Sequence, residues 1–227
     1  MEPKRAAAEK AVAYIHDGMV VGLGTGTTAY WAIQQIGKRV QEGLHIRAIA
    51  TSSHSESLAR ELGIPIVSFS EIDGIDLTID GADEVDLAWN VTKGGGGALL
   101  REKIVASASK RLVIIVDESK LAPQLGRFPL PVEIVKFGHE WTLKRLASLG
   151  CQATLRTFSS GDGPYITDNG NYIADCAFGR ITNPQILHEQ INQIPGVVDN
   201  GLFIGMAGSV VVGYRDGSVR ELEKESL

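Results

Sequence analysis

Residues 19–40, MVVGLGTGTTAYWAIQQIGKRV, decide the fold of this chain. The first six of them, 19–24, are apolar or glycine, as expected of a short buried strand. From 28 to 40 the apolar residues recur on one helical face: Ala29, Ile33, Ile36 and Val40. A loop of glycine and threonine joins the two elements. A buried strand that leads into an amphipathic helix predicts the start of a parallel α/β sheet with both faces covered.

The same alternation continues through the first half of the chain. We expect strands at 46–50, 64–69, 76–80 and 112–116, and helices at 55–62 and about 98–108. The pattern changes near Gly126, where prolines punctuate the sequence. Beyond it we expect a strand at 132–137, a helix at 140–149 and a strand at 152–157. A further strand without assigned bounds follows, then a helix at 183–194 and a strand at 197–203. This β-α-β-β-α-β order is the ferredoxin-like pattern.

Two dipeptides predict tight hairpin turns, Asn169-Gly170 and Asp216-Gly217. Strands at 209–214 and 218–222 flank the second turn, and we expect them to return to the first domain. The predicted fold is therefore α/β: a Rossmann-like, mainly parallel sheet domain plus a smaller α+β ferredoxin-like domain. The expected boundaries are 1–128 with 205–227 for the first domain and 129–204 for the second.

Composition and charge narrow the function. The 227 residues carry 22 Lys and Arg against 27 Asp and Glu, a net charge of -5 that argues against nucleic-acid or anionic-membrane partners. No apolar run approaches the ~20 residues of a membrane span, and the N-terminal residues lack a signal-peptide pattern. Cys151 and Cys176 form neither a disulfide framework nor a CxxC pair. We therefore expect a cytoplasmic protein without a structural zinc site.

In open α/β sheets, ligands bind beyond the carboxyl ends of the strands. Here those ends are polar, with the segments 25–28, 51–53, 80–83 and 117–120. Strand ends also need turn-forming residues, which explains any one of the four segments equally well. The four together favour a binding site.

The first of these segments resembles a loose dinucleotide fingerprint, G-x-G-x-x-A, from Gly24 to Ala29. A dinucleotide site also requires an acidic residue at the end of the next strand, where this chain has Thr51-Ser52-Ser53. No GxxxxGK[ST] motif is present. A glycine and threonine loop that opens a helix offers N–H groups and hydroxyls to an anion, and a small phosphate ester fits it better.

Asp80 and Asp83 place two carboxylates around Gly81-Ala82 in one turn. Paired carboxylates can hold sugar hydroxyls or move protons, because repulsion and burial raise the pKa of one of them. Two other uses remain open at this point, a divalent metal site and a helix cap.

A run of four glycines, Gly94 to Gly97, follows Lys93 and precedes a predicted helix that carries Glu102. Such a run costs much conformational entropy, so we expect its backbone to lie directly against a ligand. Lys93 could then stabilise an oxyanion, and Glu102 could transfer a proton. The structural alternative is a solvated lysine and a glutamate favoured by the helix dipole.

These motifs closely resemble the type A ribose-5-phosphate isomerase family. Its characteristic segments occur here in the family's order: GLGTGTTA, DLTIDGADEVD, KGGGGALLREK, VDESK, FPLPVEI, TDNGNYI and IPGVV. Thr27 stands where the family often has Ser, and Gly97 where Ala is common. The resemblance implies a metal-free isomerase without a cofactor, which acts on a small phosphorylated sugar and assembles as a homo-oligomer, a dimer or tetramer.

The resemblance also assigns roles to matching residues. Glu102 is similar to the family's proton-transferring base, with Asp80, Asp83 and Lys93 as the further catalytic residues. The implied substrate-binding residues are Thr25, Gly26, Thr27, Thr28, Asp80, Gly81, Ala82, Asp83, Lys93, Gly94, Gly95, Gly96, Lys120 and Lys4. Two other function classes remain as alternatives: a sugar-phosphate sensor without catalysis, and a nucleotide-dependent oxidoreductase that uses Gly24 to Ala29.

Overall fold

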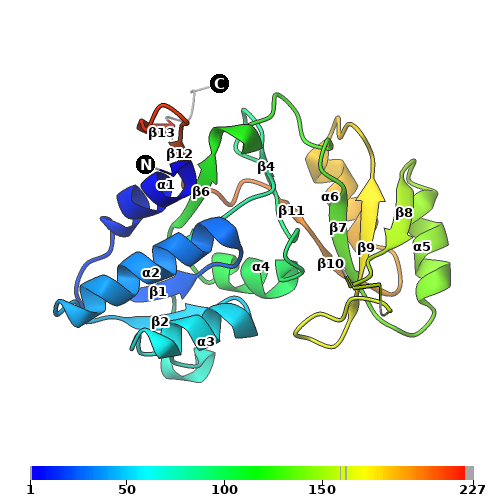
Figure 1. The fold of residues 1–227 in the computed structure, drawn as a ribbon. Helices are drawn as coiled ribbons and strands as arrows, with labels where there is room; N and C mark the ends of the chain where they lie inside the picture. The colour runs from blue at the N-terminus through cyan, green and yellow to red at the C-terminus, as the bar shows by residue number, and fades with distance from the viewer. Residues whose placement is uncertain (1, 159, 162, 223–227) are drawn as a thin grey trace. The chain divides into compact units, whose positions relative to one another are not determined.

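The computed structural model describes residues 2–158, 160–161 and 163–222. The chain divides into two compact units, each assembled from separate segments (Figure 1). The first unit comprises Met1–Ala82, Arg101–Leu121 and Gly205–Leu227, and the second comprises Asp83–Leu100 and Ala122–Ile204.

The first unit is built on a six-stranded sheet with the order β13-β12-β6-β3-β1-β2. Its strands are β1 Val20–Leu23, β2 Arg47–Ala50, β3 Leu77–Asp80, β6 Leu112–Asp117, β12 Ser209–Gly213 and β13 Val219–Leu222. All neighbouring pairs in this sheet are parallel except the β12–β13 hairpin. The predicted return of this hairpin to the first domain is confirmed, since β12 pairs with β6.

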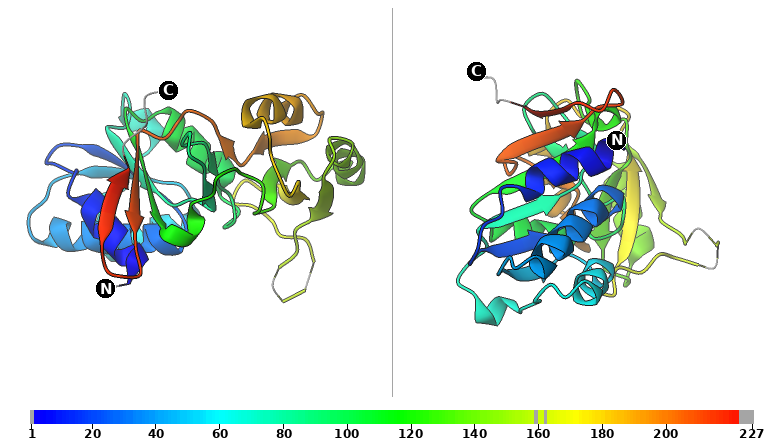
Figure 2. Two further views of the ribbon diagram at one scale, coloured as in Figure 1. Left: turned by 90° about the horizontal axis from the view of Figure 1, so that it is seen from above. Right: turned by 60° about the vertical axis from the view of Figure 1, so that its left-hand side comes forward.

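Helices cover both faces of this sheet. On one face α1 (Pro3–Val12) and α2 (Thr27–Gln41) pack against each other and against the strands (Figure 2), while α3 (Ser53–Glu61) packs on β2 and α2. The strands alternate between the faces: Val21 and Ala48 join the core under α1 and α2. Val20 and Ile49 join Val105 of α4 (Leu99–Ser107) in a separate cluster.

The prediction of a strand at 64–69 is wrong. Only one parallel bridge forms there, between Ala48 and Ile66. Ser68 then accepts from and donates to Glu71 in a capping box, which starts the short 3-10 helix Phe69–Glu71. The cap turns the chain away from the sheet edge before a strand can extend.

The second unit contains a four-stranded antiparallel sheet with the order β10-β7-β9-β8. Its elements are β7 Leu130–Ile134, α5 His139–Ala147, β8 Gln152–Leu155, β9 Tyr172–Ala177, α6 Pro184–Asn192 and β10 Val197–Asn200. Their order along the chain is the ferredoxin-like one, so the predicted fold class is confirmed. Leu130, Val132 and Ile134 are fully buried in the core of this unit.

A three-stranded sheet, β11-β5-β4, completes the second unit. Its strands are β4 Glu84–Val85, β5 Val91–Thr92 and β11 Leu202–Phe203. The strand expected at 197–203 is therefore split, because Gly201 separates two stretches that pair in different sheets. The pairing of β5 with β11 also explains why 83–100 belongs with the second unit, whereas the sequence pattern had grouped these residues with the first domain.

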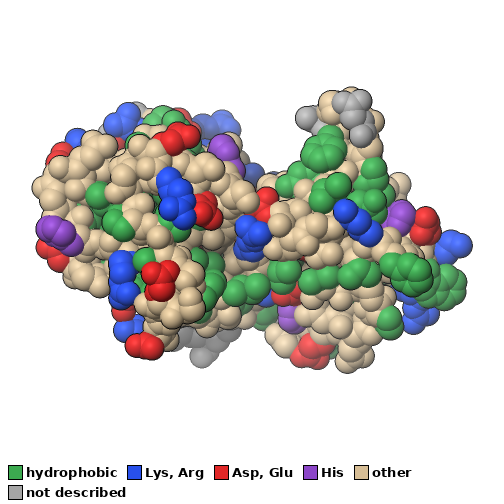
Figure 3. Space-filling view, turned by 90° about the horizontal axis from the view of Figure 1, so that it is seen from below, with side chains coloured by type: hydrophobic (Ala, Val, Ile, Leu, Met, Phe, Trp, Pro, Cys, Tyr) green, Lys and Arg blue, Asp and Glu red, His purple; other side chains and the backbone are tan. Residues whose placement is uncertain are grey.

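Among the described residues, no helix is both long and apolar enough to cross a membrane. On the face drawn in Figure 3, the side chains of Lys and Arg are interspersed with those of Asp and Glu. The mixed signs agree with the small net charge of -5.

The central strand β6 should tolerate truncation poorly. Ile115 is fully buried there, whereas Ile186 on α6 is 50% exposed. We expect Ile115→Ala to lower the free energy of unfolding by about 2–5 kcal/mol, because it leaves a cavity. Ile186→Ala should change it by less than about 1 kcal/mol. Urea denaturation followed by circular dichroism measures both, and equal losses would contradict this account of the core.

Candidate active site

Asp80, at the end of β3, fixes the loop between β1 and α2. Its Oδ1 accepts the N–H groups of Thr25 at 3.0 Å and Gly81 at 2.7 Å. The residue is 1% exposed. A Cβ at position 24 would lie 2.1 Å from the same Oδ1, so only glycine fits between β1 and this carboxylate. The loop therefore depends on Asp80 for its shape.

The hydroxyl of Thr25 lies in a cluster of side-chain hydroxyls. Its Oγ1 is 2.7 Å from Thr51 Oγ1, 2.8 Å from Ser52 Oγ and 3.3 Å from Ser55 Oγ. The polar ends of β1 and β2 are thus brought together, as the sequence predicts. The Thr25 hydroxyl ties the two loops to each other.

The N-terminus of α2 presents the features of an anion site. Gly26 is the N-cap residue, with φ +99°, and it has no side chain to accept from the first N–H groups of the helix. Such N–H groups attract anions, and the helix dipole adds to the effect. Lys4 Nζ donates to Thr27 Oγ1 at 3.0 Å, which places a cation beside the helix start. Thr28 is largely buried.

Lys120 belongs to the same charged neighbourhood as Lys4, because both act on Asp117 at the end of β6. Burial raises the pKa of Asp117, but hydrogen bonds from Ser119 and the charges of the two lysines outweigh this and hold it below its ordinary value. Asp117 is therefore ionised at neutral pH.

Glu102 lies in the first turn of α4, which begins at Leu99 directly after the glycine run. Its residue is 4% exposed. A carboxylate at the start of a helix is favoured by the dipole, and burial removes it from bulk water. These are conditions under which a glutamate can exchange a proton with a carbon acid.

Asp83 and Lys93 belong to the second unit. The carboxylate of Asp83 accepts the N–H of Gly95 at 2.7 Å through Oδ2. Lys93 is 2% exposed, its own N–H donates to Gly201 O at 2.8 Å, and its Nζ is 5.6 Å from the centroid of the Phe203 ring. Asp80 and Asp83 thus have different backbone partners, despite their closeness in sequence.

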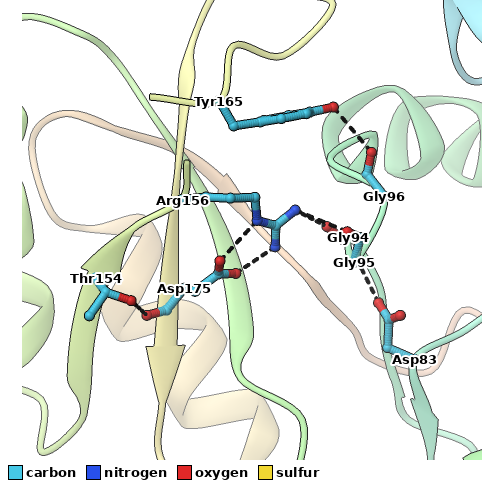
Figure 4. A network of polar contacts seen from close by, with 8 residues as sticks. All are labelled: Asp83, Gly94, Gly95, Gly96, Thr154, Arg156, Tyr165 and Asp175. Carbon is cyan, nitrogen blue, oxygen red and sulfur yellow. Dashed lines mark hydrogen bonds and ion pairs between the residues drawn. The ribbon is translucent and has the colours of Figure 1, made fainter. Parts of the chain in front are cut away.

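Two residues that no sequence motif marks contact the glycine run, Arg156 and Tyr165, and Asp175 pairs with Arg156 (Figure 4). Arg156 and Tyr165 lie in the segment between β8 and β9, about 60 to 70 residues beyond the glycines that they contact, and Asp175 lies on β9. No local motif marks such residues. Only the pairing of β8 with β9 could have pointed to an ion pair between Arg156 and Asp175.

Comparisons with known proteins identify the family. A family model described as ribose 5-phosphate isomerase A (phosphoriboisomerase A) matches residues 47–217. A ribose-5-phosphate isomerase A of Bacillus mycoides is 54% identical, over 96% of this chain and 98% of the relative.

Solved structures agree. Ribose 5-phosphate isomerase A of Methanocaldococcus jannaschii superposes with a TM-score of 0.92 at 41% identity, covering 97% of this chain and 98% of that one. A D-ribose-5-phosphate isomerase in complex with phospho-erythronic acid gives a TM-score of 0.93 at 40% identity, with 97% of each chain covered.

The chain belongs to the ribose 5-phosphate isomerase A family. The resemblance inferred from the motifs is thereby confirmed, and with it the prediction of an isomerase. Membership in this family of isomerases replaces both alternatives, the sugar-phosphate sensor and the nucleotide-dependent oxidoreductase.

Whether this chain binds a metal ion depends on the arrangement of its own ligand-forming side chains. Within 2–158, 160–161 and 163–222, no group of three or more His, Cys, Asp and Glu side chains could hold a metal ion. Asp80 and Asp83 both bind backbone N–H groups. The independence of this family member from metals stays a prediction.

That prediction can be tested by removing divalent ions. After exhaustive dialysis against EDTA, we expect isomerase activity to be retained, because lysines and N–H groups balance the charges of the acids. Activity is measured in metal-free buffer, with and without added Mg²⁺ or Mn²⁺. A loss that either ion restores would show that the acids bind a metal.

Proposed function

We propose that this member of the family interconverts D-ribose 5-phosphate and D-ribulose 5-phosphate by proton transfer through an ene-diolate, as part of the pentose phosphate pathway. The observation that carries the proposal is the buried Glu102, at the start of the helix that follows Lys93 and the glycine run. One of the related structures contains phospho-erythronic acid. The carboxylate of that acid is planar and carries negative charge on oxygen, as does an ene-diolate, in which the two oxygens lie on adjacent planar carbons.

The phosphate group of the substrate binds at the start of α2 in this proposal. The N–H groups of the first turn, the hydroxyls of Thr27 and Thr28, and Lys4 supply hydrogen bonds and positive charge. Lys120 adds to that charge, as its effect on Asp117 indicates. The backbone of Gly26 approaches the phosphate closely because it has no side chain. The hydroxyl of Thr25 supports the loop.

Opening of the furanose ring requires an acid–base group, and the proposal assigns this step to Asp83. Asp80 is 1% exposed, and its Oδ1 already accepts two backbone N–H groups. Asp83 is half-buried and accepts one backbone N–H through Oδ2. Its carboxylate can therefore exchange a proton with a sugar hydroxyl at lower cost to the protein.

Glu102 then removes the proton from C2 of the open-chain aldose, and the electron pair of the C–H bond forms the C1–C2 double bond. Negative charge develops on the aldehyde oxygen O1, which Lys93 and glycine-run N–H groups stabilise. Glu102 delivers its proton to C1. The proton of the C2 hydroxyl is transferred to O1, so that C2 becomes the ketone carbon and C1 carries the hydroxyl. The electrons stay within the sugar, so the isomerisation needs no cofactor that accepts a hydride.

The setting of the enzyme belongs to the same proposal. We expect it to act in the cytoplasm on small phosphorylated sugars, without nucleic-acid or membrane partners, as a homo-oligomer. Cys151 and Cys176 are free thiols, in keeping with a reducing compartment. Large apolar side chains remain exposed, among them Phe137 at 94% and Leu87 at 82%, and contacts between copies would cover such residues.

The phosphate assignment predicts a defect in substrate affinity. Thr28→Ala removes one hydrogen bond to a charged group, so we expect KM for ribose 5-phosphate to rise about tenfold with a smaller change in kcat. Unphosphorylated ribose should be a poor substrate, because remote binding energy helps to position the reacting carbons. Steady-state kinetics measure both, with the exposed Thr182→Ala as control. Equal turnover of ribose and ribose 5-phosphate would refute the assignment.

The proton-transfer assignment predicts a defect in chemistry. Glu102→Gln keeps the size of the side chain but cannot accept the C2 proton, so kcat should fall by ~10²-fold or more with little change in KM. In D₂O the native enzyme should incorporate deuterium at C1, at least in part, and the variant far more slowly. Glu61→Gln, an exposed carboxylate at the end of α3, is the matched control. Near-normal turnover by Glu102→Gln would make Asp80 or Asp83 the base.

A further inference from the structure

Arg156 divides its guanidinium between two sets of acceptors, all within the second unit. On one side it forms a two-pronged ion pair with Asp175 of β9, with Nε donating to Oδ2 at 2.9 Å and Nη2 donating to Oδ1. On the other side, Nη1 donates to the carbonyl oxygens of Gly94 at 3.0 Å and Gly95 at 3.1 Å. Figure 4 shows this guanidinium between the carboxylate and the glycine run.

These contacts set the direction of the N–H groups in the glycine run. In a trans peptide, the C=O and the following N–H point to opposite sides of the chain. The Gly94 carbonyl faces Arg156, and the Gly95 N–H accordingly points the other way, to Asp83 Oδ2 at 2.7 Å. By the same geometry, the Gly95 carbonyl bound to Arg156 turns the Gly96 N–H away from the guanidinium.

Tyr165 fixes the next peptide. Its hydroxyl donates to Gly96 O at 3.2 Å. Burial raises the pKa of Tyr165, and the charge of Asp168 adds to the effect, so the phenol keeps its proton at neutral pH. Gly97 has φ +81°, and a Cβ there would lie 2.4 Å from the Tyr165 oxygen. The Gly97 N–H closes a turn onto Gly94 O at 2.9 Å.

Such external contacts are needed because four consecutive glycines have the greatest backbone freedom of any tetrapeptide. The side chains of Arg156 and Asp175 are only 15% and 26% exposed, which strengthens their pairing relative to a solvated surface pair. A lysine could not replace this arginine, because one ammonium group cannot bind a carboxylate and two carbonyls in a fixed plane.

We propose that Arg156, held by Asp175, is a positioning residue for the isomerisation: it orients the peptides of Gly94 to Gly96 so that their N–H groups face Asp83 and the developing ene-diolate. This inference rests on the proposed function. In this proposal Arg156 does not contact the reacting atoms of the sugar. It acts through the backbone of the glycine run.

The inference predicts that variants of Arg156 lose turnover more than substrate affinity. For Arg156→Lys we expect kcat to fall by roughly 10- to 100-fold, as for misplaced oxyanion donors, while KM stays within about twofold. Inhibition by phospho-erythronic acid should weaken by about the same factor as kcat/KM, because its carboxylate resembles the ene-diolate. Tyr165→Phe removes a single hydrogen bond and should lower kcat by a smaller factor, about two- to tenfold.

The matched control is Thr154→Val. Thr154 lies two residues before Arg156, and its hydroxyl donates to the main-chain oxygen of Asp175 at 3.5 Å. This variant should retain the native kcat, KM and inhibition constant. A purely structural ion pair would instead give Arg156→Lys a lower melting temperature with native kcat in the folded protein. That result, or a rise in KM alone, would overturn the inference.

Amide hydrogen exchange of the free enzyme gives a readout that does not depend on turnover. In Arg156→Lys, the amides of Gly95 and Gly97 should exchange faster than in the native chain, and in Thr154→Val they should not. Unchanged exchange would overturn the inference even if activity fell. If the native enzyme failed to isomerise ribose 5-phosphate, the proposed function would be refuted, while exchange would still report whether Arg156 orders the glycine run.

Discussion

One carboxylate oxygen, Asp80 Oδ1, organises the carboxyl end of the parallel sheet. It accepts the N–H groups of Thr25 and Gly81, and so links the end of β3 to the loop that follows β1. A buried carboxylate needs such donors, because its desolvation is otherwise costly. The requirement extends to Gly24, whose backbone passes too close to Asp80 for any side chain. The hydrogen bond from the Thr25 N–H to Asp80 Oδ1 therefore fixes the loop that leads into the start of α2.

The two glycine-containing loops are held in place by different kinds of contact. In the first unit, a short loop is held from inside by a buried acid and by the hydroxyls around Thr25. In the second unit, the longer run Gly94–Gly97 is held from outside by Asp83, Arg156 and Tyr165. Both arrangements leave backbone N–H groups with fixed directions. Fixed dipoles of this kind stabilise developing charge without having to reorganise during the reaction.

The sequence predicts the elements whose periodicity is strong and whose partners are near in the chain. The segment that became β1 and α2 is an example. The motifs also indicated Asp80, Asp83, Lys93 and Glu102 as candidate site residues, and their roles stay predictions. Predictions failed where a local cap or a tertiary pairing overrides an apolar stretch. The capping box at Ser68 ended an apolar stretch, and Gly201 sent two halves of one stretch to different sheets. No sequence pattern predicts the contacts of Arg156, because it donates to carbonyl oxygens about 60 residues away in the chain.

The place of β12 in the sheet has a consequence for biosynthesis. Strand β6 ends at Asp117, but its neighbour β12 begins at Ser209, after the whole of the second unit has been made. On the ribosome, the edge of β6 therefore stays unpaired while more than ninety residues are added. That edge carries Val113, Ile114 and Ile115, an apolar strand of the kind that pairs with other chains when exposed. Nascent chains of this protein thus have a defined window in which chaperones that shield strand edges would matter most.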